Sequence, residues 1–453
     1  MPLQTAIMGV LVLAIVATYF AAWWMSPLAK AWTGCSPTVR KVSWTVIVLW
    51  TVSRAVIFEA RADPTSLMTD GLSGQNIFQL VVATLAVMWA GYLLVTRKVP
   101  LLALVVGPRF WVSVLLFVFV ATTAWSIWPE YTVYRSGELL ALWVTTVHII
   151  TSSRNHLQDT TWMLGLTMVA YWFGGMVNSG GLGAFQGGGF AALRANVGAM
   201  AAGGYIVILV SEGLSGRNVS LTKWGFGLAS TLVFGSMSSI LALLVALPTL
   251  WVYRSTRALA WVRLLAIFLP TSLIAGIIIL SPGLEAGILS TFSALFDKDI
   301  RLIMTLTGRL PMWEAIWVVS RNNPWGAGFA AADRLITDLL ASANIGWAAT
   351  HAHNGYIAAW VGGGWPGVII LVVMLGSTWA CTDHLNLPVR ALARALLIFM
   401  LINNMTIVGI GGFANATWLL FMAVTLFPVR HYENSTAPQP LPATRWRGSG
   451  IRG

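Results

Sequence analysis

The sequence predicts an all-α protein that crosses a membrane many times, and three observations lead to this prediction. The 453-residue chain is 57% hydrophobic and only 9% charged, whereas a water-soluble domain carries about 25% charged residues. Apolar runs of about 20 residues recur along most of the chain, which is the length that an α-helix needs to cross a bilayer. The runs are continuous rather than alternating, so helices are favoured over a transmembrane β-barrel.

The apolar runs predict about 12–13 transmembrane helices, each about 20 residues long or shorter. The first run is followed by large residues and a basic loop, so it is interpreted as a span rather than a cleaved signal peptide. The predicted spans lie near residues 3–25, 42–58, 75–96, 110–127, 138–152, 161–178, 195–211, 223–236, 238–252, 264–281, 355–380, 392–408 and 415–429.

These spans divide the chain into four parts. Residues 1–281 form an N-terminal transmembrane bundle, and residues 282–353 form a large, partly helical loop. Residues 354–429 return to the membrane, and residues 430–453 form a basic tail. The loop is nearly neutral and is therefore expected to be extracytoplasmic and to carry the chemistry.

The lysines and arginines are distributed by loop. They concentrate in one alternating set of loops and in the tail, and such an excess marks the cytoplasmic face. The net charge of +12 therefore reflects membrane topology and does not indicate a nucleic-acid partner. Residues 224–252 connect two basic loops, so the chain must cross an even number of times there. Two short helices joined near Gly235-Ser236 are predicted, with a re-entrant hairpin as the alternative.

The outer loop contains an amphipathic helix pattern in "TGRLPMWEAIWVVSRNNPWGAGF" at residues 307–329. Pro311 suits the first turn of a helix, and Asn323-Pro324 is expected to end it. Such a tryptophan-rich helix can lie along the membrane interface, or it can pack on its own loop. The side predicted to be apolar carries Met312, Trp313, Ile316 and Trp317.

A few groups capable of chemistry fall at the predicted outer face. His351 and His353, two of only six histidines, stand just before a strongly apolar run. Arg309 begins the loop helix, and Arg194 lies beside the span that starts near residue 195. Guanidinium groups bind phosphate oxygens in a bidentate way, and an imidazole suits general-base catalysis. Together these groups predict attack by a hydroxyl, with a diphosphate as the leaving group.

The His-x-His pair has two other interpretations. It could be a pair of metal ligands, but no carboxylate or cysteine stands within a few residues to complete the set usual for zinc. His353-Asn354 could instead cap the following span, since Asn is a good N-cap. The two cysteines, Cys35 and Cys381, are far apart and show no redox or zinc spacing, so they are expected to be free thiols.

Three stretches resemble the signature of a known superfamily, the O-antigen ligases and polysaccharide polymerases. They are "TGRLPMWE" at 307–314, "NPWGAGF" at 323–329 and "HAHNGYIAAWVGGGWPG" at 351–367. The resemblance is closest to the rhizobial-type exopolysaccharide polymerases, whose early Trp-Ser-x-x-Pro segment is similar to "WSIWPEYT" at 125–132.

The resemblance implies an inverting glycosyl transfer that uses a glycan on undecaprenyl diphosphate and needs no metal, cofactor or nucleotide sugar. It assigns Arg309 to the diphosphate and His353 to the essential histidine, with His351 as its partner. Arg194 is the candidate for a second diphosphate ligand. In the family the corresponding arginine lies upstream of a Gly-x-Phe stretch, whereas Arg194 lies inside the stretch "GGGFAALRANVG". The residues expected to support these groups or to bind the acceptor are Asn354, Tyr356, Glu314 and Asn196.

The sequence therefore predicts a polymerase of lipid-linked oligosaccharide repeat units in the bacterial inner membrane, with its active site facing the periplasm. Its partners would be the lipid-linked donor and acceptor, membrane lipid and, as a further candidate, a chain-length regulator. A ligase that moves the glycan to lipid A core or protein is the alternative within the family. A transporter or flippase is the alternative of another class, but it predicts charged groups near the membrane midplane. The predicted spans are nearly free of charge, with Arg54 as the main exception.

Overall fold

The computed structural model of the protein describes residues 36–55, 74–153, 155–178, 196–234, 236–254, 309–331, 335–336 and 352–427. Within these ranges the chain forms helices and no strand. The helices are α2 (Pro37–Ala55), α4 (Gly74–Val95), α5 (Leu102–Val105), α6 (Pro108–Ala121), the 3-10 helix η2 (Thr122–Trp125), α7 (Pro129–Thr151), α8 (His156–Asn178), α10 (Asn196–Leu214), α11 (Leu221–Phe234), α12 (Met237–Arg254), α16 (Arg309–Ser320), α18 (Gly355–Cys381), the 3-10 helix η5 (Thr382–His384), α19 (Leu387–Asn404) and α20 (Ala416–Thr425).

The all-α membrane fold is confirmed. Every predicted span that falls in the described ranges coincides with a helix, whereas the spans near 3–25 and 264–281 lie outside them. Within the described part of the chain, five segments are long and apolar enough to cross a membrane. They are Asn76–Val95, Pro108–Trp125, Asn196–Leu214, Gly355–His384 and Leu387–Asn404.

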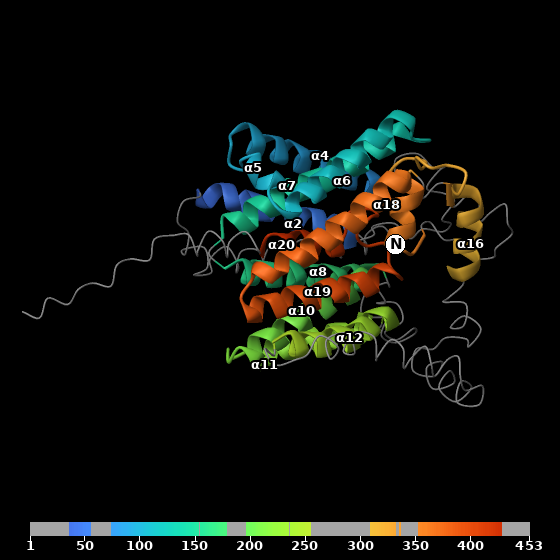
Figure 1. Ribbon diagram of the computed structural model, residues 1–453. Helices are drawn as coiled ribbons and strands as arrows, with labels where there is room; N and C mark the ends of the chain where they lie inside the picture. The colour runs from blue at the N-terminus through green and yellow to red at the C-terminus, as the bar shows by residue number, and fades with distance from the viewer. Residues whose placement is uncertain are drawn as a thin grey trace, which may run out of the picture.

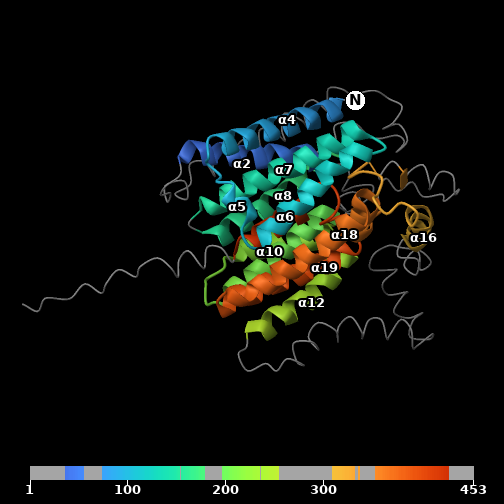
Figure 2. The same ribbon diagram turned by 45° about the horizontal axis from the view of Figure 1, so that its top comes forward.

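The long helices run side by side as one bundle, and α16 stands apart at one end of it beside α18 (Figure 1). A second view places α4 and α12 at opposite edges of the bundle (Figure 2). The end that carries α16 and the start of α18 is called the His353 end below. The opposite end carries the connection between α10 and α11.

The break predicted near Gly235-Ser236 is confirmed, because α11 ends at Phe234 and α12 begins at Met237. The two helices run in opposite directions. Ser239, at the start of α12, donates a hydrogen bond to Asn403 at the His353 end, where α19 finishes. Arg254, at the end of α12, donates to Ser215 at the opposite end. Each helix packs on α10, so the two short helices form an antiparallel pair beside it.

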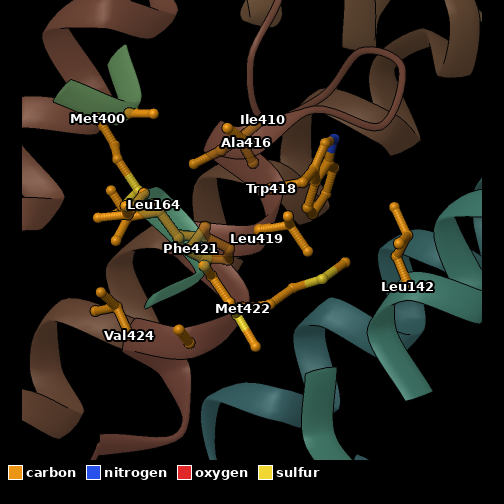
Figure 3. Packing of buried hydrophobic residues seen from close by; sticks show 14 of the residues in the cluster. Leu142, Leu164, Met400, Ile410, Ala416, Trp418, Leu419, Phe421, Met422 and Val424 are labelled. Atoms are coloured by element: carbon orange, nitrogen blue, oxygen red, sulfur yellow. The ribbon is translucent and has the colours of Figure 1, made fainter. Parts of the chain in front are cut away.

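Helix α20 differs from the span predicted at 415–429, because it ends at Thr425 after ten residues. At about 1.5 Å per residue it measures about 15 Å, which is too short to cross a bilayer. All of its residues are buried, so it fills the centre of the bundle instead. Figure 3 shows Trp418 and Phe421 of α20 among side chains of other helices, including Leu142, Leu164 and Met400.

Helix α7 begins earlier than the span predicted at 138–152. It starts at Pro129, because proline and the following Glu130 suit a first helical turn. Glu138 therefore lies within the helix, where it is fully buried and paired with Arg54 of α2. A second buried pair joins Arg40 of α2 to Asp159 of α8. The helices consequently hold more ionisable groups than the sequence predicts, and these are paired between helices.

Candidate active site

A short turn segment, residues 324–328, connects the motifs that the sequence singles out. The Ala327 N–H donates to the Val361 carbonyl at 2.7 Å, and the Gly328 N–H donates to the Gly362 carbonyl at 3.0 Å. The Trp365 N–H donates back to the Pro324 carbonyl at 2.9 Å. Segment 324–328 is therefore paired, backbone to backbone, with the middle of α18.

The loop before α7 holds the other side of this segment. The Ile127 N–H donates to the Ala327 carbonyl at 3.0 Å, and the Thr132 hydroxyl donates to the Phe329 carbonyl at 3.0 Å. The Phe329 N–H donates to the Thr122 hydroxyl at 2.9 Å. The three stretches at 125–132, 323–329 and 351–367 are thus brought together at the His353 end.

Glycine is needed where the backbones of 324–328 and α18 meet. Gly364 has φ +63° and ψ −160°, which interrupts α18 in a conformation that L side chains rarely adopt. A Cβ at Gly364 would collide with the Pro324 carbonyl, and one at Gly326 would lie 2.5 Å from the Gly364 nitrogen. The span predicted at 355–380 is therefore a kinked helix, a feature that its "GGGWP" run could have signalled.

Asn354 caps α18, as the sequence predicts. Its side-chain oxygen accepts hydrogen bonds from the N–H groups of Tyr356 and Ile357, at 2.9 and 3.1 Å. Its side-chain nitrogen donates to the Met405 carbonyl at 3.1 Å, which ties the start of α18 to the end of α19. The cap holds the backbone on one side of His353.

His353 itself is half-buried and has φ +48°, in the left-handed region. A residue other than glycine rarely takes this conformation, and such strain concentrates at functional sites. The backbone at His353 is therefore not extended. His351 lies outside the described residues.

Helix α16 packs against α18 through Met312 and Ile316, which are buried beside Trp360 and Val361. Its start at Arg309 and its end at Ser320 agree with Pro311 in the first turn and with a stop before Asn323-Pro324. The side of α16 that is predicted to be apolar is not fully covered by the bundle, since the Trp317 side chain is 51% exposed.

Trp313 connects α16 directly to the chain before His353. Its indole N–H donates to the Ala352 carbonyl at 2.7 Å, and Ala352 is fully buried. Because the Ala352 carbonyl belongs to the peptide bond that leads into His353, this bond holds the other side of the histidine backbone.

Arg309 lies one helical turn before Trp313, so the two side chains share a face of α16. Its Nε is buried and has no hydrogen-bond partner among the described residues. Burial lowers the pKa of the Arg309 guanidinium from its ordinary value, because desolvation disfavours the charged form. An arginine stays protonated in proteins, so the site holds a half-buried cation whose buried Nε donor has no partner among the described residues.

The other predicted site residues that the structure describes lie on α10, α16 and α18. Glu314 is exposed on α16, and Asn196 is exposed as the first residue of α10. The Tyr356 hydroxyl donates to the Leu401 carbonyl at 3.2 Å, so it faces α19. Arg194 lies outside the described residues.

The sequence also raises a metal site and free thiols as interpretations. Among the described residues, no group of three His, Cys, Asp or Glu side chains could hold a metal ion. Cys381 is a free cysteine, as predicted, and Cys35 lies outside the described ranges.

A comparison with protein-family models matches residues 224–372 to the family described as O-Antigen ligase. The matched range contains α11, α12, α16 and the first part of α18, and therefore both Arg309 and His353. A comparison with curated proteins found no match. The family match agrees with the motifs at 307–314, 323–329 and 351–367, and over residues 224–372 it supports the similarity of this multi-pass membrane protein to the O-antigen ligase and polysaccharide polymerase superfamily.

Proposed function

We propose that this protein is an inverting, metal-independent glycosyltransferase. It would join undecaprenyl-diphosphate-linked oligosaccharide repeat units into exopolysaccharide at the periplasmic face of the bacterial inner membrane. The observation that carries the proposal is the hydrogen bond from Trp313 to the Ala352 carbonyl. It couples the helix that begins with Arg309 to the peptide bond before His353, so that a cation and an imidazole serve one site.

Each group has a role that suits its surroundings. Arg309 has a buried donor without a partner among the described residues, and it would bind the diphosphate of the donor. His353 would accept the proton of the attacking hydroxyl, because its reference pKa lies near neutrality. A charge-assisted hydrogen bond contributes about 1.5–3 kcal/mol, and it acts more strongly in a water-poor site.

The proposed reaction is a single displacement. The acceptor hydroxyl oxygen forms a bond to the anomeric carbon of the donor sugar as the bond from that carbon to the diphosphate breaks. The bonding electrons leave with undecaprenyl diphosphate, whose charge Arg309 stabilises, and the hydroxyl proton passes to His353. Attack opposite the leaving group inverts the anomeric configuration.

A ligase is the second candidate, because the matched family is described as O-Antigen ligase. A ligase uses the same donor chemistry but passes a finished glycan to lipid A core or protein. The two activities are separated by what a deletion strain accumulates. Single lipid-linked repeat units indicate a missing polymerase, whereas full-length lipid-linked polymer indicates a missing ligase.

The proposed site is tested by complementing the deletion strain with variants at matched membrane abundance. Wild type and His384→Ala should restore long polymer, since His384 is exposed in η5, after α18 has ended. His353→Ala should restore none or very little. If His353→Ala restored normal polymer, the histidine would serve only as part of the helix cap, and the proposed mechanism would be refuted.

A further inference from the structure

A second cationic cluster lies between α2, α4 and α7, away from Arg309. Glu138 is fully buried and accepts hydrogen bonds from two arginines, Arg54 and Arg135. Arg54 also donates to the side-chain oxygen of Gln79 at 2.9 Å and to the hydroxyl of Tyr134 at 3.3 Å. Among the described residues, one carboxylate thus pairs with two guanidiniums, which leaves one positive charge in excess.

Arg135 carries the unused binding capacity. Its Nε donates to the Tyr131 hydroxyl at 2.9 Å and its Nη1 donates to Glu138 at 3.1 Å. A guanidinium has five N–H donors, so three of them have no bond to a described residue. The guanidinium carbon lies 4.9 Å from the ring centroids of both Tyr131 and Tyr134. The two rings hold the group in one orientation while its outer donors remain available for a ligand.

The cluster lies at the His353 end and near exposed apolar side chains. Thr132 bonds to the Phe329 carbonyl at the His353 end. Arg135 is three residues further along α7, and so its Cα lies about 4.5 Å along the helix axis from that of Thr132. The neighbouring side chains of Val133 and Leu80 are apolar and 55% and 43% exposed. An apolar exposed surface beside a partly exposed cation suits a ligand with a lipid tail and an anionic head.

We propose that Arg135, oriented by Tyr131 and Tyr134 and assisted by Arg54, forms a second phosphate-binding site for a membrane-anchored lipid phosphate. Among the described residues this cluster has one positive charge in excess, and such a charge within a helix bundle is costly unless it has a partner. A bidentate phosphate would supply that partner. Within the proposed polymerase, on which this assignment rests, the ligand is the diphosphate of the acceptor's lipid carrier. Both substrates of a polymerase carry that group, and Arg309 serves only the donor.

The alternative is that Arg135 only holds helices together, and the charges distinguish the two roles. Removal of Arg135 leaves Arg54 and Glu138 as a balanced pair. A ligand-binding role therefore predicts that Arg135→Gln keeps the lipid-free unfolding temperature of the wild type. A structural role predicts a clear fall in that temperature, and such a fall would overturn the proposal.

Binding is measured by native mass spectrometry of the full chain in detergent with undecaprenyl diphosphate. Wild type and Arg217→Gln should bind two lipids, since Arg217 is an exposed arginine at the opposite end of the bundle. Arg309→Gln and Arg135→Gln should each bind one, and the double variant none. The affinity of the affected site should fall about tenfold or more, as expected for the loss of a charge-assisted contact. Wild-type binding by Arg135→Gln or Arg135→Lys would contradict the proposal.

A competition arm identifies the lipid. If excess phosphatidylglycerol displaces the molecule bound at Arg135, the site accepts phospholipid headgroups. If it does not, the site selects the diphosphate carrier, as the acceptor role requires. Lipid counting does not depend on turnover. A failure of polymer formation would therefore refute the proposed function, whereas unchanged lipid counts would refute only the second site.

Discussion

At the scale of single residues, the most informative feature is the left-handed backbone of His353. Its conformation is held from both sides, by the bond from Trp313 to the Ala352 carbonyl and by the Asn354 cap. A residue other than glycine in this region costs about 1–2 kcal/mol. A side chain that served only as part of a helix cap would gain nothing from this strain, so the strain favours a functional role for the imidazole.

The strain at His353 gives a prediction in which stability and activity separate. His353→Gly should have a free energy of unfolding about 1 kcal/mol higher than His353→Ala, because glycine takes a positive φ without steric cost. Both variants should lose about 10²–10⁴-fold in turnover, the usual contribution of a positioned general base. Chemical denaturation in detergent and a glycan-transfer assay measure the two effects. Equal activity in His353→Gly and wild type would remove the imidazole from the mechanism.

Arg309 gives a second prediction at this scale. Arg309→Lys keeps the charge but loses the planar fork that binds a phosphate in a bidentate way, so transfer should fall strongly. Arg321→Lys is the matched control, because Arg321 is exposed just after the same helix ends. The measurement is the initial rate of transfer at saturating donor. Wild-type rates in Arg309→Lys would show that any cation suffices there.

At the scale of elements, the interruption of α18 at Gly364 shapes the site. It frees the Val361 carbonyl and the Trp365 N–H, which an unbroken helix would pair with each other, to bond to segment 324–328. The Gly362 carbonyl is also free to bond there, because its helical partner would be Pro366, which has no N–H. The kink thereby holds the loop of α16 against the bundle.

Substitution of two glycines in α18 tests this view. Gly364→Ala should lower the free energy of unfolding by about 2 kcal/mol or more, since it forces a Cβ into a positive φ and against the Pro324 carbonyl. Gly376→Ala lies in the same helix with open space around it and should be neutral or slightly stabilising. Thermal unfolding in detergent compares them. Equal effects of the two substitutions would mean that the pairing of segment 324–328 does not depend on the kink.

How much could be predicted from the sequence differs between local and long-range features. The Asn354 cap, the start of α16 and the break between α11 and α12 depend on local signals, and the structure confirms them. The bond beside His353 comes from Trp313, forty residues earlier, and the pairing at Gly362 comes from a distant loop. Such contacts have no local sequence signal, because they arise only when separate elements pack together.

Buried charge was the other feature that the sequence could not place. Glu138 and Arg135 stand at the edge of an apolar run, so the span predicted at 138–152 starts at Glu138 and leaves Arg135 out. In the structure α7 includes both, because Arg54 on another helix compensates the carboxylate. A partner eighty-four positions away cannot be identified from the pattern around residue 138.

At the scale of the whole molecule, the account requires that α16 lie outside the cytoplasm. A cysteine-free variant carrying Asn322→Cys, at the His353 end, should react with an impermeant thiol reagent in intact spheroplasts. Asn218→Cys, exposed between α10 and α11 at the opposite end, should react only after lysis. The reverse pattern would place Arg309 and His353 in the cytoplasm and would separate them from a periplasmic donor.

The most direct test of the central claim is glycan transfer by the purified protein. Wild-type protein is given a synthetic undecaprenyl-diphosphate repeat unit with EDTA and without nucleotide sugar, and both product length and released undecaprenyl diphosphate are measured. The account predicts a ladder of longer glycans and one released diphosphate lipid for each new linkage, with both lost in His353→Ala and in Arg309→Lys. Absence of products from the wild type, or full activity of the two variants, would contradict it.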